Sequence, residues 1–531
     1  MAEVGSTAHA ASNQPQWRPR FNPWLIALVV TLASFMEVLD TSIANVALPH
    51  IAGGLSSSED EATWVLTSYL VSNAIILPLS GWFSVLIGRK RFYMVCVAMF
   101  TLSSFLCGIA PSLALLVLFR VLQGIGGGGL QPSEQAILAD TFLPRQRGMA
   151  FAIYGIAVVT APAIGPTLGG WITDNFTWRW IFFINIPVGI VSMILTSVMV
   201  DDPPYFTKDR MQKLKGKLQV DYWGIIFIAL GLGFLQIVLD KGERDDWWAS
   251  NFIRTCIVIS VAGLILAVYW ELTHKDPVVD LSLLKNRSFA IPAFLMFMVG
   301  VILLGSTVLI PQYLQLVMGY SATEAGLAIS PGGILVMCML PFVGILLGKV
   351  EARWLIGLGL AITSLALIHM TTFNTEISYR YAAVARCFQA AGLAFLFVPI
   401  NTAAYAFVPP GKNNAASGLI NLARNIGGSV GISLVTTILD RRSQFHQNRL
   451  IEFTTPLNPR FNASMHAITG VFGPGYSGNG PYALMFRNLE RQAETLSYID
   501  CFWVLGVGFA VLIPLVFLIK KSTPGRGAAA H

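Results

Sequence analysis

Residues 34–49 read SFMEVLDTSIANVALP and place two acidic residues, Glu37 and Asp40, inside an apolar run. The run begins near Trp24 and reaches about Val46, long enough for a helix that crosses the hydrocarbon core of a bilayer. Each ionised side chain at the centre of such a helix costs roughly 2.5–3.5 kcal/mol on insertion scales. The stretch therefore predicts a membrane span in which Glu37 and Asp40 have a functional role.

The composition of the whole chain agrees with a membrane location. Of its 531 residues, 54% are hydrophobic and 12% are charged, whereas a soluble domain has about 25% charged residues. The net charge of +7 is spread over short loops, which argues against a nucleic-acid-binding patch. The six cysteines form no CxxC pair, and no zinc-ligand spacing occurs. The sequence predicts an integral membrane protein with no catalytic residue, metal or cofactor.

Fourteen apolar runs are long enough to span a bilayer, and the short alternating segments of membrane strands are absent. The spans are predicted near residues 24–46, 63–85, 92–110, 113–136, 148–172, 179–199, 221–240, 253–271, 289–311, 325–347, 354–373, 381–406, 413–439 and 498–520. The predicted fold class is therefore an all-α membrane protein. Of 35 Lys and Arg residues, 21 fall on the side of the N-terminus when alternate loops are assigned to opposite sides, which predicts cytoplasmic termini.

Several stretches echo each other in the two halves of the chain. Arg120 and Gln123 form an R-x-x-Q pattern in the fourth span, and Arg386 and Gln389 repeat it in the twelfth. GWFSVLIGRKR after the second span is echoed by GILLGK after the tenth. The echoes align spans one to six with spans nine to fourteen. Parallel six-helix repeats with a substrate site between them are typical of a large class of transporters.

This alignment predicts the organisation of the chain. The predicted parts are a cytoplasmic tail at 1–23, an N-terminal six-helix bundle at 24–200, a basic linker with two inserted spans and the following cytoplasmic loop at 201–287, a C-terminal six-helix bundle at 288–520 with a long periplasmic loop at 440–497, and a cytoplasmic tail at 521–531.

Four motifs make the sequence similar to a known family. They are LDTSIANVALP from Leu39, RVLQGIGGG from Arg120, APAIGPTLGG from Ala161 and WRWIFFINIPVG from Trp178. With them the chain resembles the 14-span drug:proton antiporters of the major facilitator superfamily, and most closely the EmrB-type exporters. The resemblance implies export of hydrophobic or amphipathic compounds in exchange for protons, from the inner membrane of a Gram-negative bacterium. It also implies a periplasmic adaptor protein and an outer-membrane channel as partners.

Two alternatives remain beside multidrug efflux. The first is a dedicated exporter of a lipid, siderophore or antibiotic that the host makes. The second is a membrane receptor that binds ligands without moving them, against which the duplicated halves argue.

The buried charges are the candidates for proton coupling. Asp40 and Arg120 lie at about the same depth in their spans, so they can pair directly or through Gln123. Glu37 lies deeper and has no evident partner, and burial beside another carboxylate favours its neutral form. We predict that Glu37 carries the proton and meets cationic substrates, while Asp40 and Arg120 modulate it. The alternatives are a permanently protonated Glu37 and a structural Asp40–Arg120 clamp.

The remaining candidates line the cavity or move the bundles. The substrate cavity is predicted to contain Glu37, Asn45, Gln123 and Arg424. The gating or hinge residues are predicted to be Gly81, Gly88, Arg89, Gly165, Pro166, Gly169 and Gly170, because small residues allow close helix approach and a proline allows a kink.

Three further expectations concern single positions. The family motif after the second span usually has an aspartate between its glycines, where this chain has Val85, so the usual aspartate latch is in question. Trp64, Tyr69 and Asn73 can face the cavity or pack in the core, and core packing is the prediction. Glu134 is predicted to lie solvated near the cytoplasmic end of the fourth span, with a role in proton exit or substrate entry as the alternative.

Overall fold

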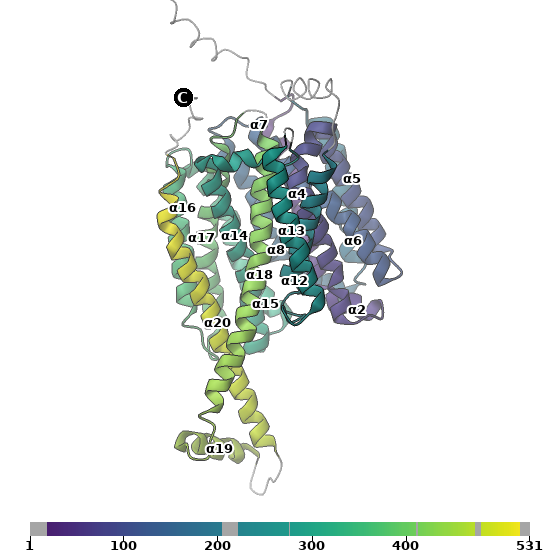
Figure 1. Cartoon of the computed structure of the whole chain (residues 1–531). Coiled ribbons are helices and arrows are strands. Elements are labelled where there is room, and N and C mark those ends of the chain that lie inside the picture. The colour runs from purple at the N-terminus through teal and green to yellow at the C-terminus, as the bar shows by residue number, and fades with distance from the viewer. Residues whose placement is uncertain (1–18, 204–220, 275–276, 410–411, 473–478, 521–531) are drawn as a thin grey trace, which may run out of the picture.

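The computed structural model describes residues 19–203, 221–274, 277–409, 412–472 and 479–520, and in these residues the regular structure is helical with no strand (Figure 1). The all-α prediction is confirmed. Most of the predicted N-terminal tail, the basic linker at 204–220 and the C-terminal tail lie outside the described residues.

The helices follow the order that the apolar runs predict, with several breaks. The first half contains α1 (Pro23–Val46), α2 (Leu48–Gly54), α3 (Glu59–Ala62), α4 (Trp64–Ile87), α5 (Arg89–Gly108), α6 (Leu113–Gly127), α7 (Leu130–Thr141), α8 (Arg147–Asn175), α9 (Trp180–Phe183) and α10 (Asn185–Met199). The insert contains α12 (Tyr222–Lys241) and α13 (Asn251–Thr273). The second half contains η2 (Leu281–Lys285), α14 (Arg287–Gln312), η3 (Tyr313–Val317), α15 (Ala322–Leu346), α16 (Ala352–Met370), α17 (Tyr379–Tyr405), α18 (Asn413–Ile451), α19 (Pro459–Phe472) and α20 (Gly480–Val516).

In the described residues, 13 helical segments are long and apolar enough to cross a membrane. The bent helix α8 is a fourteenth, with a 45° bend between Pro162 and Ile164. The prediction of fourteen spans agrees with this set. The fourth span is broken at Gly128–Gly129 into α6 and α7, and the sixth is broken at Ile184 into α9 and α10.

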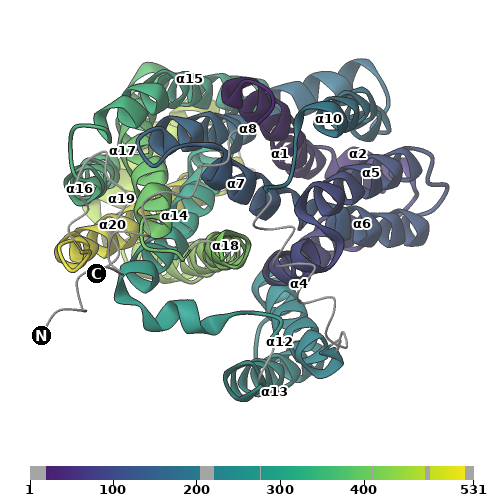
Figure 2. The same cartoon turned by 90° about the horizontal axis from the view of Figure 1, so that it is seen from above.

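The helices form two bundles side by side, with the insert at one flank (Figure 2). The first bundle contains α1 to α10, and the second contains α14 to α20. The bundles meet where α8 packs against α15 and α17, and where α18 packs against α4 and α7. The α12–α13 pair packs against α4, and α12 also contacts α18. The insert thus touches both bundles at their junction.

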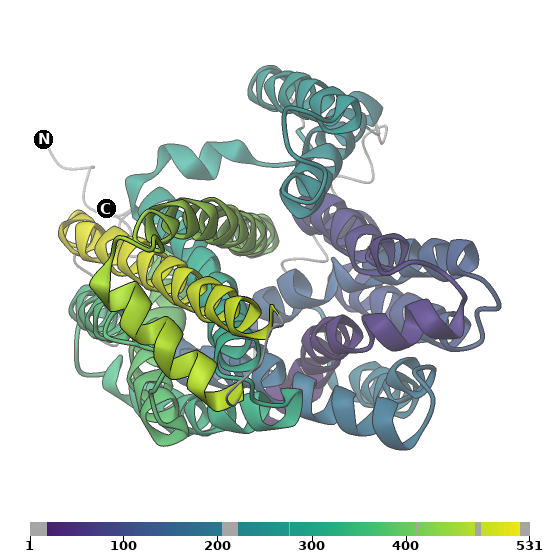
Figure 3. The same cartoon turned by 90° about the horizontal axis from the view of Figure 1, so that it is seen from below.

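The two ends of the molecule differ. We call the end where α1 begins and α20 finishes the terminus end, and the opposite end the hairpin end (Figure 1). At the hairpin end α18 and α20 continue past the other helices, and α19 lies across them (Figure 1). Seen from below, this hairpin lies over the second bundle (Figure 3). The segment predicted as a loop at 440–497 is therefore largely helical in its described part, which corrects that expectation. A hydropathy scan stops where polar residues begin, but a solvated helix continues through them.

Small residues hold helices close enough to place the polar side chains that follow. A Cβ atom on Gly124 of α6 would lie 2.4 Å from the carbonyl oxygen of Tyr69 on α4. Between α14 and α18, a Cβ on Gly427 would lie 2.0 Å from the carbonyl oxygen of Phe297. Backbones that approach this closely are typical of helix pairs in membranes.

Candidate functional site

A cavity of about 520 Å³ lies between the two bundles, within the usual size range of small-molecule sites. Its deep wall contains Glu37 from α1 and Arg424 from α18. The wall continues to Thr63, Gln312 and Thr436, which lie toward the hairpin end of their helices. The predicted cavity residue Asn45 also lies in this wall.

At the terminus end the bundles are in contact. The amide nitrogen of Asn413 on α18 donates to Asp140 Oδ1 on α7 at 2.6 Å. A Cβ atom on Gly81 of α4 would lie 3.2 Å from the backbone of Ala415, so the predicted gating residue Gly81 is a point of close approach. Because this end is packed, the cavity extends toward the hairpin end.

Arg89, in the motif that has Val85 in place of an aspartate, has an acidic partner on another helix. Arg89 pairs with Asp140 on α7 through Nη1 and Oδ2 at 2.6 Å, and also donates to the carbonyl oxygen of Ala136 at 2.8 Å. Asp140 thus joins the predicted gating residue Arg89 to Asn413 of the other bundle. Gly88 has a φ of 98°, a conformation that suits glycine between α4 and α5.

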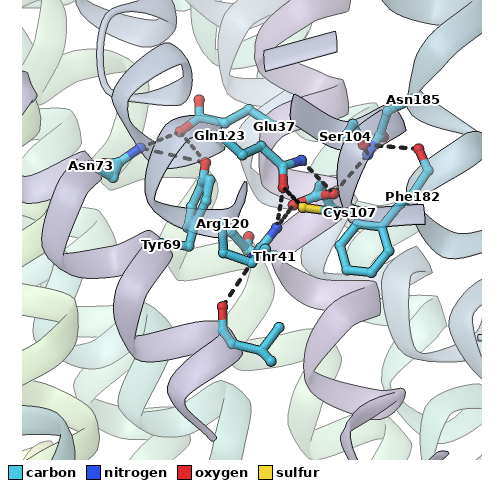
Figure 4. A network of polar contacts seen from close by, with 12 residues as sticks. Glu37, Thr41, Tyr69, Asn73, Ser104, Cys107, Arg120, Gln123, Phe182 and Asn185 are labelled. Carbon is cyan, nitrogen blue, oxygen red and sulfur yellow. Dashed lines mark hydrogen bonds and ion pairs between the residues drawn. The ribbon is translucent and has the colours of Figure 1, made fainter. Parts of the chain in front are cut away.

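Asp40 lies in a closed polar network inside the first bundle, and Figure 4 shows its partners. Arg120 Nη1 donates to Asp40 Oδ2 at 2.6 Å. Gln123 Nε2 and Asn185 Nδ2 both donate to Asp40 Oδ1, at 3.1 and 2.7 Å. Arg120 also donates to Gln123 Oε1 at 2.7 Å and to the carbonyl oxygen of Val65 at 3.0 Å. The predicted Asp40–Arg120 pair is present, both directly and through Gln123.

Arg120 is the member of this network that reaches the cavity wall, whereas Asp40, Gln123 and Asn185 are not part of that wall. The side chains of Arg120 and Asp40 are 0% and 1% exposed. Gln123, predicted as a cavity residue, is fully buried between Arg120 and Asp40 and does not belong to the wall of this cavity. Its side chain points into the bundle because both of its polar atoms are used by the ion pair.

Glu37 belongs to a second network, in the cavity wall. Gln131 Nε2 donates to Glu37 Oε2 at 2.9 Å. Asn73 Nδ2 and the Tyr69 hydroxyl donate to Glu37 Oε1, at 3.1 and 3.3 Å (Figure 4). Glu37 therefore has three partners where the sequence indicated none. Tyr69 and Asn73 are buried, as predicted, and both also belong to the cavity wall, which was the alternative.

Gln131 connects Glu37 to the other bundle. Its amide oxygen accepts a hydrogen bond from the Tyr154 hydroxyl at 2.8 Å and another from Arg424. Arg424 Nη1 also donates to the Tyr154 hydroxyl at 2.8 Å. The amide dipole of Gln131 thus has its NH₂ group at the carboxyl of Glu37 and its oxygen at the guanidinium of Arg424. A change of charge on Glu37 acts on Arg424 through one side chain.

A second contact joins the bundles beside this one. Asn425 Nδ2 on α18 donates to Asn73 Oδ1 on α4 at 3.0 Å. Asn421, one turn before Asn425, donates to Gln135 Oε1 on α7 at 2.9 Å. The polar contacts around Glu37 are therefore shared by α1, α4, α7 and α18.

Glu134 lies in the protein interior, contrary to the prediction of a solvated acid. Thr31 Oγ1 donates to Glu134 Oε1 at 2.5 Å, and Glu134 is fully buried. The contact with Thr31 of α1 joins two helices far apart in the sequence, so the depth of Glu134 along its own span does not reveal it.

The predicted hinge residues lie on α8, which packs against α1. Pro166 has no N–H group for the carbonyl oxygen of Pro162, and the Ser42 hydroxyl donates to that oxygen at 3.5 Å. A Cβ atom on Gly165 would lie 2.2 Å from Ser42 Oγ. The bend in α8 is thus supported by the residue of α1 that follows Asp40 by two positions.

The other two predicted hinge glycines differ from each other. A Cβ on Gly169 would lie 3.1 Å from the Ile43 side chain, whereas a Cβ on Gly170 would meet no atom within 4 Å. Close packing explains Gly169 and not Gly170.

Comparison with known proteins finds a matching family and several proteins of similar sequence. The family described as Major Facilitator Superfamily matches residues 30–432. The chain is 35% identical over 516 residues to the multidrug export protein EmrB of Escherichia coli K12, which covers 96% of this chain and 98% of that protein. It is 37% identical over 497 residues to EmrB of Haemophilus influenzae, covering 93% and 95%. The solved structure of the proton:xylose symporter XylE is similar with a TM-score of 0.60 at 15% identity, covering 95% and 97%.

Proposed function

The chain belongs to the major facilitator superfamily, and on this premise we propose that it exports hydrophobic or amphipathic compounds in exchange for protons. The resemblance to EmrB-type multidrug exporters is confirmed, as is the fold of two six-helix bundles with two inserted helices. The chain is therefore a multi-pass membrane transporter and not an enzyme.

The link from Glu37 through Gln131 to Arg424 is the observation that carries the proposal of proton coupling. Glu37 is 4% exposed and lies in the wall of a cavity between two bundles that must move relative to each other. An ionised Glu37 attracts Arg424 through Gln131 and holds α1 against α18. A proton on Glu37 removes that attraction and frees the bundles to rearrange.

An exchange cycle follows from this geometry. In the described arrangement the cavity extends to the hairpin end, where a proton reaches Glu37 and displaces a cationic substrate. The neutral Glu37 releases Arg424, the bundles rock, and the terminus end opens. The proton then leaves on that side, and the recovered charge on Glu37 attracts the next substrate. For a neutral substrate, each proton that crosses 100 mV is worth about 2.3 kcal/mol, enough for roughly fifty-fold accumulation. For a monovalent cation exchanged one for one, no net charge moves, and the pH gradient alone supplies the free energy.

Transport by the wild-type protein in liposomes tests this function. With a pH gradient imposed across the membrane, we expect uptake of a lipophilic cationic dye against its own gradient, because proton movement supplies the free energy. A protonophore should stop the uptake. Dye that moves equally well without a pH gradient would contradict proton coupling, and no dye movement at all would favour a dedicated substrate.

The orientation and the division of the chain belong to the same proposal. The excess of Lys and Arg at the terminus end supports cytoplasmic termini in a bacterial inner membrane. We divide the chain into bundles at 24–200 and 288–520, with the linker and insert at 201–287. The hairpin end then faces the periplasm.

The projecting hairpin is the proposed contact with a periplasmic adaptor, which would pass substrate on to an outer-membrane channel. Phe453, Leu457 and Tyr482 are 63%, 93% and 64% exposed, and they lie where α18 ends and α20 begins. Large apolar side chains on a segment beyond the membrane spans are typical of protein–protein contacts. Their place supports docking at the hairpin end.

Changing these side chains separates adaptor docking from transport. The combined substitution Phe453→Ser, Leu457→Ser and Tyr482→Ser is expected to lower drug resistance of intact cells by about tenfold, since hot-spot aromatic and apolar contacts dominate interfaces. Uptake in liposomes should remain at the wild-type rate. Ser464→Ala on exposed α19 is the matched control. Full resistance in the triple variant would contradict docking by this hairpin.

A further inference from the structure

The second copy of the R-x-x-Q pattern differs from the first in one respect. Arg386 Nη1 donates to Gln389 Oε1 at 2.6 Å, as Arg120 Nη1 does to Gln123 Oε1 at 2.7 Å. In the first copy Asp40 of α1 completes the set. In the second, α14 corresponds to α1 and contains no Asp or Glu, and Arg386 forms no ion pair among the described residues.

The atoms that would hold a carboxylate in the second copy have no partner. Gln123 Nε2 donates to Asp40, but Gln389 Nε2 is buried without a hydrogen-bond acceptor in the described residues. Arg386 Nε is unpartnered in the same way, although Arg386 is only 7% exposed. A buried cation with unmet donors is costly. The unpartnered donors of Arg386 and Gln389 point to a ligand that supplies the missing anion.

Arg386 lines a small cavity that lies beside the main one. The small cavity has a volume of about 40 Å³, room for a few waters or one carboxylate group. Pro162, Leu303 and Thr307 belong to the walls of both cavities. The rest of the small cavity is mainly apolar, with Val159 and Leu393 in its wall. A ligand in the main cavity can therefore place one small anionic group at Arg386.

We propose that the small cavity at Arg386 is a binding subsite for the carboxylate head of an amphipathic substrate whose apolar part lies in the main cavity. The carboxylate accepts from the guanidinium of Arg386, which lines the small cavity and whose Nε has no partner in the described residues, while Gln389 holds Nη1 of the same guanidinium. The subsite lies in the second bundle, while Glu37 lies in the first. Anionic and cationic amphiphiles therefore bind at different points of one cavity. This substrate class rests on the proposed export function.

Binding of two amphiphiles with the same chain and opposite heads tests the subsite. The purified protein in phosphatidylcholine nanodiscs is titrated with dodecanoate and with dodecyltrimethylammonium, and binding is measured by calorimetry. Arg386→Gln is expected to weaken dodecanoate binding by about tenfold or more, because charge-assisted hydrogen bonds are lost. Dodecyltrimethylammonium should bind within about twofold of wild type. Arg380→Gln, at an exposed arginine near the start of the same helix, is the matched control.

A second variant keeps the buried charge compensated. Gln389→Glu supplies an internal carboxylate beside Arg386, so it should exclude dodecanoate while the melting temperature stays at or above that of wild type. Unchanged dodecanoate affinity in both variants would overturn the subsite. So would a loss that appears in Arg424→Gln and not in Arg386→Gln.

The same experiment distinguishes a substrate carboxylate from a lipid headgroup as the anion at Arg386. Nanodiscs that contain phosphatidylglycerol should leave dodecanoate binding unchanged, and competition by that lipid at Arg386 would assign the site to a lipid headgroup and overturn the substrate assignment. Equilibrium binding needs neither a proton gradient nor transport. A protein that binds dodecanoate through Arg386 but moves nothing in liposomes would contradict the export function and not the subsite.

Discussion

Replacing Glu37 by Gln is expected to abolish dye uptake driven by a pH gradient while exchange of dye for dye, without a gradient, continues. Gln keeps the size of the side chain and can still accept hydrogen bonds from Tyr69 and Asn73. It cannot take up or release a proton. The loss in gradient-driven uptake should be about a hundredfold, in the range that loss of a positioned proton-transfer group causes.

The control for Glu37→Gln is another acid buried in the membrane. Glu271 on α13 is 5% exposed and accepts the backbone N–H of Val279 at 3.1 Å, which Gln can also do. It lies on the inserted helix pair, outside the cavity wall. Glu271→Gln should retain gradient-driven uptake. If uptake persists in Glu37→Gln as well, Glu37 is not the proton carrier.

The same variant tests whether Glu37 is the group that titrates when a cationic dye binds. Wild-type dye binding should weaken as pH falls, because a proton on Glu37 removes the negative charge that attracts a cation. In Glu37→Gln this pH dependence should disappear. Dye binding that keeps the wild-type pH profile would place the titrating group elsewhere.

The sequence specified the membrane fold and its acids, because apolar length and isolated charges are local properties. Glu37, Asp40 and Arg120 stand out in any scan of the spans, and their depth along a helix follows from the rise per residue. The depth of an acid along its helix does not tell which neighbours its side chain faces. Residues three positions apart differ by about 60° around a helix, and that rotation turns Glu37 to the cavity and Asp40 to the interior of its bundle.

The partners of these acids depend on contacts between distant segments. Gln131 meets Glu37 across 94 positions of sequence, from α7 to α1. Asp140 of α7 likewise meets Arg89 of α5. Neutral amides and hydroxyls are common on helices, so their types alone gave no signal. The helical hairpin escaped prediction because its length comes from polar residues.

Asp40→Asn is expected to destabilise the protein by about 3–5 kcal/mol, the usual cost of removing one partner of a buried ion pair. Arg120 would remain fully buried with its positive charge uncompensated. Denaturant unfolding of the purified protein measures the change. The double variant Asp40→Asn with Arg120→Gln should recover much of the loss, because no isolated charge is then left in the bundle.

Transport by Asp40→Asn distinguishes a clamp from a proton carrier. Asp40 Oδ1 and Oδ2 are both occupied by donors from Arg120, Gln123 and Asn185, and Asp40 itself is not part of the cavity wall. A proton that binds Asp40 must break a 2.6 Å contact with a guanidinium, which makes Asp40 a poor carrier. The folded fraction of Asp40→Asn should therefore still couple dye uptake to the pH gradient. A variant as stable as wild type that exchanges dye but ignores the gradient would instead transfer the carrier role from Glu37 to Asp40.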